Sequence, residues 1–322
     1  MALKCRPVFK LRDWIKEDKL VMDNILVNPN AVDYIEKLIK KNGVKNVNWS
    51  QLCKNHNAIH LIEKHKKYID WDSLSENENA CHILINNMDK INWDKLSENP
   101  SSFHILLKDP YKISWFYLSA NYNAMRLIEY NLPRICFHQM ASNTNERAVY
   151  ILSLMKCIYG DPEKNFLIKL LWEDFSSNPG ALELLKKNKE RIDGFHMAAF
   201  NDNPECMPLL LEILEKIEDD EEKKNIYRVM SGNPIAVDWI KKNKDKISWR
   251  HLCKNPASMH IFKDYIDENP GMEEYPWESE EKGYRYLSLN GSIFMPDYNA
   301  MKRKNKKFRD EIKRMFDKKL HN

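Results

Sequence analysis

A short motif that opens with asparagine, of the type Asn-Pro-x-Ala, recurs along most of the 322 residues. Five of the nine intervals between its copies are 22 residues, and the others are 27, 35, 25 and 30 residues. A near-constant period with a few insertions indicates stacked copies of one small supersecondary unit. The motif begins at Asn28, Asn55, Asn77, Asn99, Asn121, Asn143, Asn178, Asn203, Asn233 and Asn255.

Each copy predicts two helices. Asparagine followed by proline, as in Asn28-Pro29, is typical of a helix start, because the side chain satisfies a free N–H and proline lacks one. A small residue three positions later and large apolar residues at six and seven complete an apolar stripe at helical spacing. A second, short helix precedes the asparagine. It carries an aromatic or large apolar residue six positions before and another three positions before.

The aromatic column is predicted to form the core of the array. Asn48, Asp70, Asn92, Ser114 and Ser248 stand directly before an aromatic residue and are candidate helix caps. Replacing a buried tryptophan of this column with alanine should cost about 3–5 kcal/mol. The predicted core residues are Trp49, Trp71, Trp93, Trp115, Phe137, Trp172 and Trp249.

Helices this short are marginal in isolation, so stacking must bury their stripes. We therefore predict an all-α fold, an α-solenoid of about ten two-helix repeats of about 22 residues with N- and C-terminal caps. With roughly 8–10 Å between packed helices, the array would be elongated and somewhat under about 100 Å long. The predicted segments are an N-terminal cap (1–27), repeats (28–272, with insertions near 156–165 and 215–225) and a C-terminal capping module (273–322).

Two neighbouring units carry a family resemblance. Trp71-x-x-Leu74-Ser75-x-Asn77-x-Asn79-Ala80 and Trp93-x-x-Leu96-Ser97-x-Asn99-Pro100 resemble the Asn-Pro-Asn-Ala-Ile / Asp-Trp-x-x-Leu-Ser tandem repeats of giant DNA viruses. Asp13-Trp14-Ile15 and the segment 293–301 are similar to the terminal parts of that family. The resemblance implies a viral gene product, in the virion or the infected host cytoplasm, and implies no activity.

Basic residues gather at the C-terminal end. The formal charge is +4, and residues 301–322 hold ten Lys/Arg against three Asp/Glu, so the rest of the chain sums to 4 − 7 = −3. Phe308, Ile312, Met315, Phe316 and Leu320 follow helical spacing, which predicts a basic amphipathic helix. We expect this helix to cap the solenoid; an acidic protein surface, nucleic acid or an anionic membrane are alternatives. Its candidate contacts are Lys302, Arg303, Lys304, Lys306, Lys307, Arg309, Lys313 and Arg314.

A column of mostly histidine lies five residues after the register asparagine and is a candidate binding face: His60, His82, His104, Arg126 and His260. Boundary residues that hydrogen-bond between helices are the simpler interpretation. A metal ion needs ligand atoms at about 2 Å, whereas stacked repeats are roughly 10 Å apart, so we predict no metal site. The sequence has no Gly-x-Gly-x-x-Gly, His-Glu-x-x-His or Gly-x-Ser-x-Gly motif, so neither an enzyme nor a cofactor is expected.

Other sequence signals concern the compartment. Seven scattered cysteines without a Cys-x-x-Cys pair suggest reduced thiols in an intracellular setting. The first residues lack the apolar segment of a signal peptide, so secretion is not expected. The sequence also has no apolar run of about 18 residues, so no transmembrane segment is predicted.

Together these features predict a non-catalytic helical-repeat scaffold that binds proteins. A structural component of the virion, such as a minor capsid protein that contacts other capsid proteins, is the first hypothesis. An adaptor that engages host or viral proteins in the infected cytoplasm is the alternative. Nucleic-acid binding through the basic tail is a weaker one.

Overall fold

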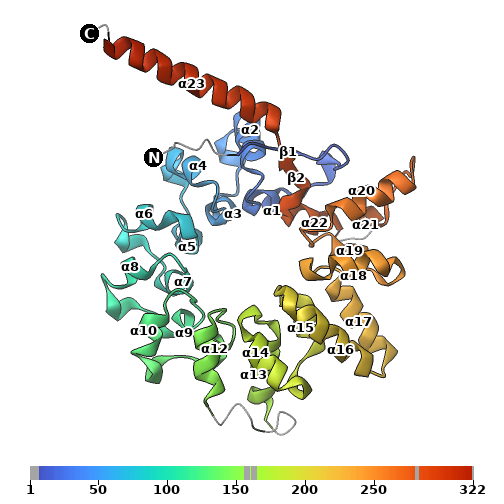
Figure 1. Cartoon of the computed structure of the whole chain (residues 1–322). Coiled ribbons are helices and arrows are strands. Elements are labelled where there is room, and N and C mark those ends of the chain that lie inside the picture. The colour runs from blue at the N-terminus through green and yellow to red at the C-terminus, as the bar shows by residue number, and fades with distance from the viewer. Residues whose placement is uncertain (1–6, 156–159, 161–164, 280–282, 321–322) are drawn as a thin grey trace.

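The computed structural model describes residues 7–155, 160, 165–279 and 283–320, with the side chains of 311–313 and 315–320 left undescribed. Within these ranges the chain is mostly helical, which confirms the all-α prediction (Figure 1). The only strands in the described ranges are β1 (Phe9–Leu11) and β2 (Phe294–Pro296). The insertion predicted near 156–165 falls largely outside the described residues.

Two rows of helices alternate along the chain. In the first row, successive helices pack side by side: α1 (Met22–Val27), α3 (Trp49–Lys54), α5 (Trp71–Ser75), α7 (Trp93–Glu98), α9 (Trp115–Leu118), α11 (Phe137–Ala141), α13 (Phe166–Ser177), α15 (Gly194–Phe200), α17 (Asp220–Met230), α19 (Trp249–Leu252) and α22 (Gly283–Leu289). The second row comprises α2 (Val32–Asn42), α4 (Ile59–Lys64), α6 (Cys81–Leu84), α8 (Phe103–Leu106), α10 (Met125–Glu129), α12 (Glu146–Ser153), α14 (Leu182–Lys187), α16 (Met207–Lys216), α18 (Val237–Lys242) and α20 (Met259–Glu268). The charged insertion near 215–225 forms the end of α16 and the start of α17.

The first-row helices begin at the caps expected from the sequence. The side chains of Asn48, Asp70, Asn92 and Ser248 each accept a hydrogen bond from the N–H three residues ahead, whereas Ser114 makes no such bond. Each accepting side chain satisfies one of the free donors at a helix start, which favours these short helices.

The register asparagine caps the helical turn that follows it in several units, as predicted, and it also has a second role. Asn77, Asn178 and Asn233 are the N-caps of short 3-10 helices that lead directly into the second-row α-helices. In the units of Asn55 and Asn99 the α-helix begins four residues after the asparagine, with Ala58 or Ser102 as its cap residue. The asparagine itself ends the first-row helix, and its Oδ1 accepts the N–H two residues ahead, as Asn99 does from Ser101 at 2.9 Å. This tight turn leaves the amide Nδ2 free to reach the neighbouring unit.

That amide builds a ladder between units. Asn99 Nδ2 donates to Ser75 O at 3.0 Å, and Asn121 Nδ2 donates to both Ser97 O and Asn99 O at 2.9 Å. The ladder asparagines are buried, and each bond satisfies a carbonyl at the end of a first-row helix. The same arrangement occurs at Asn28, Asn55, Asn77, Asn143, Asn178, Asn201, Asn233, Asn255 and Asn290.

Two positions in this ladder correct the predicted register. The eighth unit uses Asn201, which is fully buried, rather than Asn203; Asn203 instead donates to Pro179 O at 3.0 Å, as the second asparagine of other units does. Asn203 is nevertheless a helix cap, because its side chain accepts the Glu205 N–H at the start of the 3-10 helix Pro204–Cys206, which leads into α16. A further unit ends at Asn290, inside the segment predicted as a capping module.

The aromatic column lies at the edge of the core rather than at its centre. Trp49 and Trp172 are buried, while Trp71, Trp93, Trp115 and Trp249 are partly buried. The prediction is wrong for Phe137, which is 41% exposed. A cation covers several of the rings, with Lys90 Nζ 4.7 Å from the centroid of Trp71. The fully buried centre is a leucine column that includes Leu52, Leu74, Leu96 and Leu118.

The two ends of the helical array meet. α22 packs against α1, and β1 pairs antiparallel with β2, with Lys10 opposite Met295. Asn28 Nδ2 donates to Ser288 O at 3.0 Å, the same bond that joins successive units elsewhere. The expected elongated array with a cap at each free end is therefore wrong: the helices form a closed ring (Figure 1).

A polar clasp reinforces the junction. Lys16 Nζ donates to Glu278 Oε2 at 2.7 Å, and Tyr284 Oη accepts the Lys16 N–H at 3.0 Å. The Glu278 side chain is only 1% exposed, and Lys19 Nζ lies 3.6 Å from the same Oε2.

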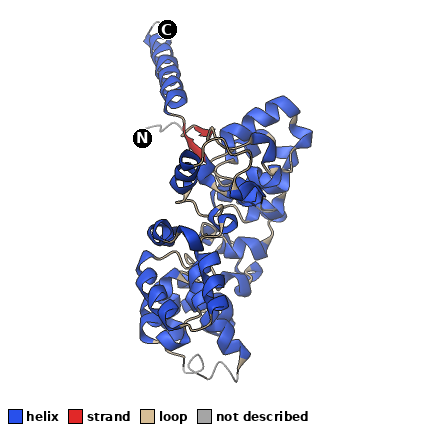
Figure 2. Cartoon of the chain, turned by 90° about the vertical axis from the view of Figure 1, so that its right-hand side faces the viewer, coloured by secondary structure: helices blue, strands red, loops and turns tan. Residues whose placement is uncertain are grey.

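The basic C-terminal helix does not cap the ring. α23 (Tyr298–Leu320) begins just after β2 and extends away from the other helices, as both views show (Figures 1 and 2). The prediction that it covers an exposed end is wrong, because the units on either side of the junction already bury each other's faces.

Candidate interaction surface

The predicted histidine face lies on the second row. His60, His82, His104, Arg126 and His260 are all exposed, on α4, α6, α8, α10 and α20 respectively. His82 Nε2 lies 3.1 Å from Glu63 Oε1 of the preceding second-row helix. The structure thus places these residues at equivalent surface positions on separate helices.

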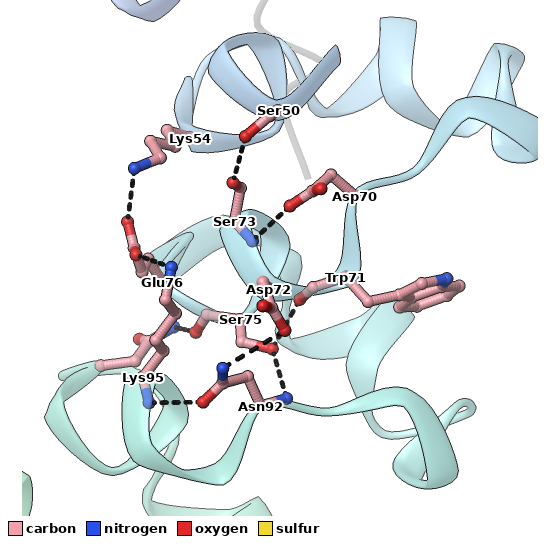
Figure 3. Close-up of polar contacts among 11 residues, drawn as sticks. Ser50, Lys54, Asp70, Trp71, Asp72, Ser73, Ser75, Glu76, Asn92 and Lys95 are labelled. Atoms are coloured by element: carbon pink, nitrogen blue, oxygen red, sulfur yellow. Dashed lines mark hydrogen bonds and ion pairs between the residues drawn. The ribbon is translucent and has the colours of Figure 1, made fainter.

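Polar residues on the first row hold successive helices together. Glu76, directly after the last residue of α5, pairs with Lys54 on α3 at 3.5 Å and with Lys95 on α7, and its hydrogen bond raises the pKa of Lys95 (Figure 3). On α5, Asp72 Oδ1 accepts from Asn92 Nδ2 at 3.2 Å. Trp71 points away from these contacts (Figure 3).

A serine hydroxyl adds a second link between units. Ser75 Oγ donates to Trp71 O at 2.8 Å and accepts the Asn92 N–H at 3.1 Å. The corresponding acceptors in other units are Ser97, Ser119, Ser176, Ser231 and Ser288. The polar side chains of α3, α5 and α7 therefore have a structural role, because they join successive helices of the first row.

The sector formed by α9, α11, α13 and α15 differs, because large aromatic side chains are exposed on it. Phe116 on α9 is 49% exposed and packs edge-on against Tyr117, with ring centroids 5.1 Å apart. On α15, Phe195 is also exposed, and Phe200 is 64% exposed. Phe116 directly follows the aromatic position, where Asp72 and Asp94 stand in α5 and α7. We call Phe116, Tyr117, Phe195 and Phe200 the aromatic flanks.

Acidic and histidine side chains lie on or next to α11, α13 and α15. His138 Nδ1 on α11 is 4.0 Å from Asp174 Oδ2 on α13. The His196 ring on α15 lies 5.7 Å from Phe195 and 6.2 Å from Phe200, between centroids. Burial raises the pKa of Asp174, and nearby Glu173 adds to this effect while His138 and His196 oppose it. We call Glu173, Asp174, Asp193 and Asp202 the acidic centre.

Three of these groups could approach one cation. Ligand atoms of Glu173, Asp193 and His196 all lie within 4.8 Å of one another. However, Asp193 Oδ1 already accepts the His196 backbone N–H at 2.8 Å as the cap of α15, and lies 2.9 Å from His196 Nδ1. The helix cap accounts for the approach of Asp193 to His196.

Two members of the acidic centre line a shallow hollow of about 280 Å³. Its lining includes Ser142, Thr144, Asp174, Ser177, Phe200 and Asp202. The hollow therefore combines an exposed aromatic ring with carboxylates and hydroxyls.

The sequence pattern missed this surface. The repeat pattern identifies residues that recur from unit to unit, whereas the aromatic flanks lie at positions where the units differ. Phe116 and Phe195 stand where other units carry Ser50, Asp72, Asp94 or Arg250, and that contrast was the available signal.

In the described part of the chain, no helix combines the length and apolar character needed to cross a membrane. Comparisons with protein families, with curated proteins and with solved structures give no match to this chain.

Proposed function

We propose that the chain is a non-catalytic helical-repeat scaffold, a solenoid of two-helix units, that binds proteins through the aromatic flanks and the acidic centre. The exposure of Phe116, Tyr117, Phe195 and Phe200 supports this proposal most directly. Exposed aromatic clusters are uncommon on monomers, and aromatic side chains dominate the energetics of protein interfaces.

The charge between the flanks specifies the partner's chemistry. Asp174 and Asp202 line the same hollow as Phe200, Asp193 caps α15, and Glu173 Oε1 lies 3.9 Å from Lys169 Nζ. A partner segment with apolar side chains and interspersed lysine or arginine would complement both features. The histidine face of the second row is a second candidate surface, supported by the exposure of its five members.

The family resemblance supports a setting for this activity. We propose a structural component of a virus particle, such as a minor capsid protein, with an adaptor in the infected cytoplasm as the alternative. Mass spectrometry of purified particles separates the two, since absence of the chain from particles excludes the structural role.

A pair of matched variants tests the surface. Phe116→Ser with Phe200→Ser removes one ring from each flank, and Tyr111→Ser with Tyr130→Ser removes two exposed rings elsewhere. Partners captured from infected cells should be lost at least about tenfold from the first variant and retained by the second, because interface aromatics each contribute over 1 kcal/mol. Equal retention by both variants would contradict the proposed surface, provided both keep the parent's unfolding temperature.

A further inference from the structure

α23 is rooted firmly at the ring junction. The Asp297 N–H donates to Val8 O at 2.8 Å, and Asp297 Oδ1 accepts the Ala300 N–H at 2.8 Å at the start of the helix. From this anchor the helix extends away from the ring (Figure 2). Its described basic side chains are exposed: Lys302, Arg303, Lys304, Lys306, Lys307, Arg309 and Arg314.

The sequence of α23 divides the helix into two sides. At about 100° per residue, positions 301, 308, 312, 315 and 316 fall within an arc of about 100°. Each of these positions carries Met, Phe or Ile. Lys304 and Arg309 fall on either border of this arc, and most other cations lie on the opposite side. The same arc also holds Asn305 and Lys319, so the uninterrupted apolar stripe runs from Phe308 to Phe316, where positive charge borders it.

We propose that α23 binds the surface of an anionic lipid bilayer, with the apolar stripe facing the acyl chains and the bordering cations among the headgroups. Helices that lie in a membrane interface combine an apolar face with a Lys/Arg-rich polar face. Bordering lysine and arginine side chains can place their stems along apolar surface and their charges in water. The ten Lys/Arg against three Asp/Glu of residues 301–322 supply the charge complementarity to anionic headgroups.

Nucleic acid is the less favoured binding partner of α23. A polyanion attracts the same cations, but phosphate contacts leave an apolar stripe exposed to water. The bilayer uses both sides of the helix, and this inference does not depend on the protein-binding surface proposed above.

The test uses the full chain with two vesicle preparations, one of phosphatidylcholine alone and one of phosphatidylcholine with 30% phosphatidylglycerol, and with a 20-base-pair DNA duplex. Co-sedimentation should show binding to the anionic vesicles and not to the neutral ones. Binding to the duplex without binding to anionic vesicles would overturn the proposal in favour of nucleic acid.

Two variants separate the contributions. Lys304→Gln with Arg309→Gln should weaken vesicle binding about 30-fold, at about 1 kcal/mol per cation and 1.4 kcal/mol per factor of ten. Phe308→Asn with Phe316→Asn keeps every charge and should weaken vesicle binding at least tenfold. Anionic-vesicle binding that is unchanged in this second variant would refute the proposal. Both variants should keep the parent's unfolding temperature, because α23 stands apart from the ring.

Discussion

A single amide side chain joins two units at each step of the ring. Asn77 is buried, donates to Cys53 O at 2.7 Å and accepts the Asn79 N–H at 3.0 Å. An aspartate has the same shape, but it would present a carboxylate oxygen to the Cys53 carbonyl. The ladder therefore requires the donor of asparagine, not merely a small polar side chain.

Asn77→Asp should lower the free energy of unfolding by about 2–3 kcal/mol, since a buried acceptor loses its donor and a charge is buried without a partner. Asn79→Asp is the matched control in the same unit: its amide donates to His56 O at 2.8 Å, but the side chain is exposed. Its cost should stay below about 1 kcal/mol. Urea unfolding measures both; similar losses would show that the ladder bond is not responsible.

His251 makes stability depend on acid. Burial, together with the nearby charges of Lys254, Arg250 and Arg228, lowers the pKa of His251 to about 4. The folded state thus favours the neutral ring, so this contribution is complete above the ordinary pKa near 6.5 and is lost as the pH falls towards 4. His251→Gln should unfold with a smaller loss of stability between pH 6.5 and 4 than the parent. Equal losses would contradict this assignment.

At the level of helices, much could be predicted from local pattern. The caps at Asn48, Asp70 and Asn92 and the apolar stripes follow from neighbours within one or two turns, so the sequence was sufficient for them. The bonds from each asparagine amide to the neighbouring unit could not be predicted, because a side-chain amide that bonds to another unit carries no local signature. The burial of the aromatic column could not be predicted fully for a similar reason. The spacing indicates a half-buried position but not the cation that covers the ring.

The clasp between the ends contributes to the dependence of stability on alkaline pH. Its hydrogen bond to Glu278 raises the pKa of Lys16, and burial raises the pKa of Tyr284. Both protonated forms are favoured by folding, so their contribution is complete below about pH 10 and is lost as the pH rises through the folded-state values.

Glu278→Gln should lower the free energy of unfolding at pH 7 by about 2 kcal/mol. This is less than the roughly 3–5 kcal/mol for a fully buried pair, because Lys16 is 39% exposed. The variant should also lose less stability than the parent between pH 9 and 11, as thermal unfolding can show. An alkaline loss identical to the parent's would rule out the Lys16–Glu278 pair as its source.

At the scale of the whole molecule, closure was beyond the reach of the sequence pattern. Asn290 is followed by Gly291 and Ile293, without the proline and small residue of the motif, so the last unit was not recognised. The pairing of β1 with β2 joins segments about 280 residues apart and leaves no periodic signal.

A disulfide tests the closure directly. Lys10→Cys with Met295→Cys places two thiols opposite each other on paired strands, within the Cα separation that a disulfide needs. The bond should form in the folded chain, and the long loop that it closes should add on the order of 5 kcal/mol to stability in the chain-entropy model. Lys10→Cys with Tyr111→Cys is the control and should not cross-link. Failure of the first pair to cross-link would indicate separated ends.

The bond between Asn28 and Ser288 also constrains how such a chain can change over generations. In an open array, a copy can be gained or lost at either end without disturbing the others. Here the small rotations from one pair of helices to the next must sum to a complete turn. A duplicated copy would overshoot the circle and force every neighbour to readjust. Sequence length can therefore vary between copies, while the number of copies is held fixed by geometry.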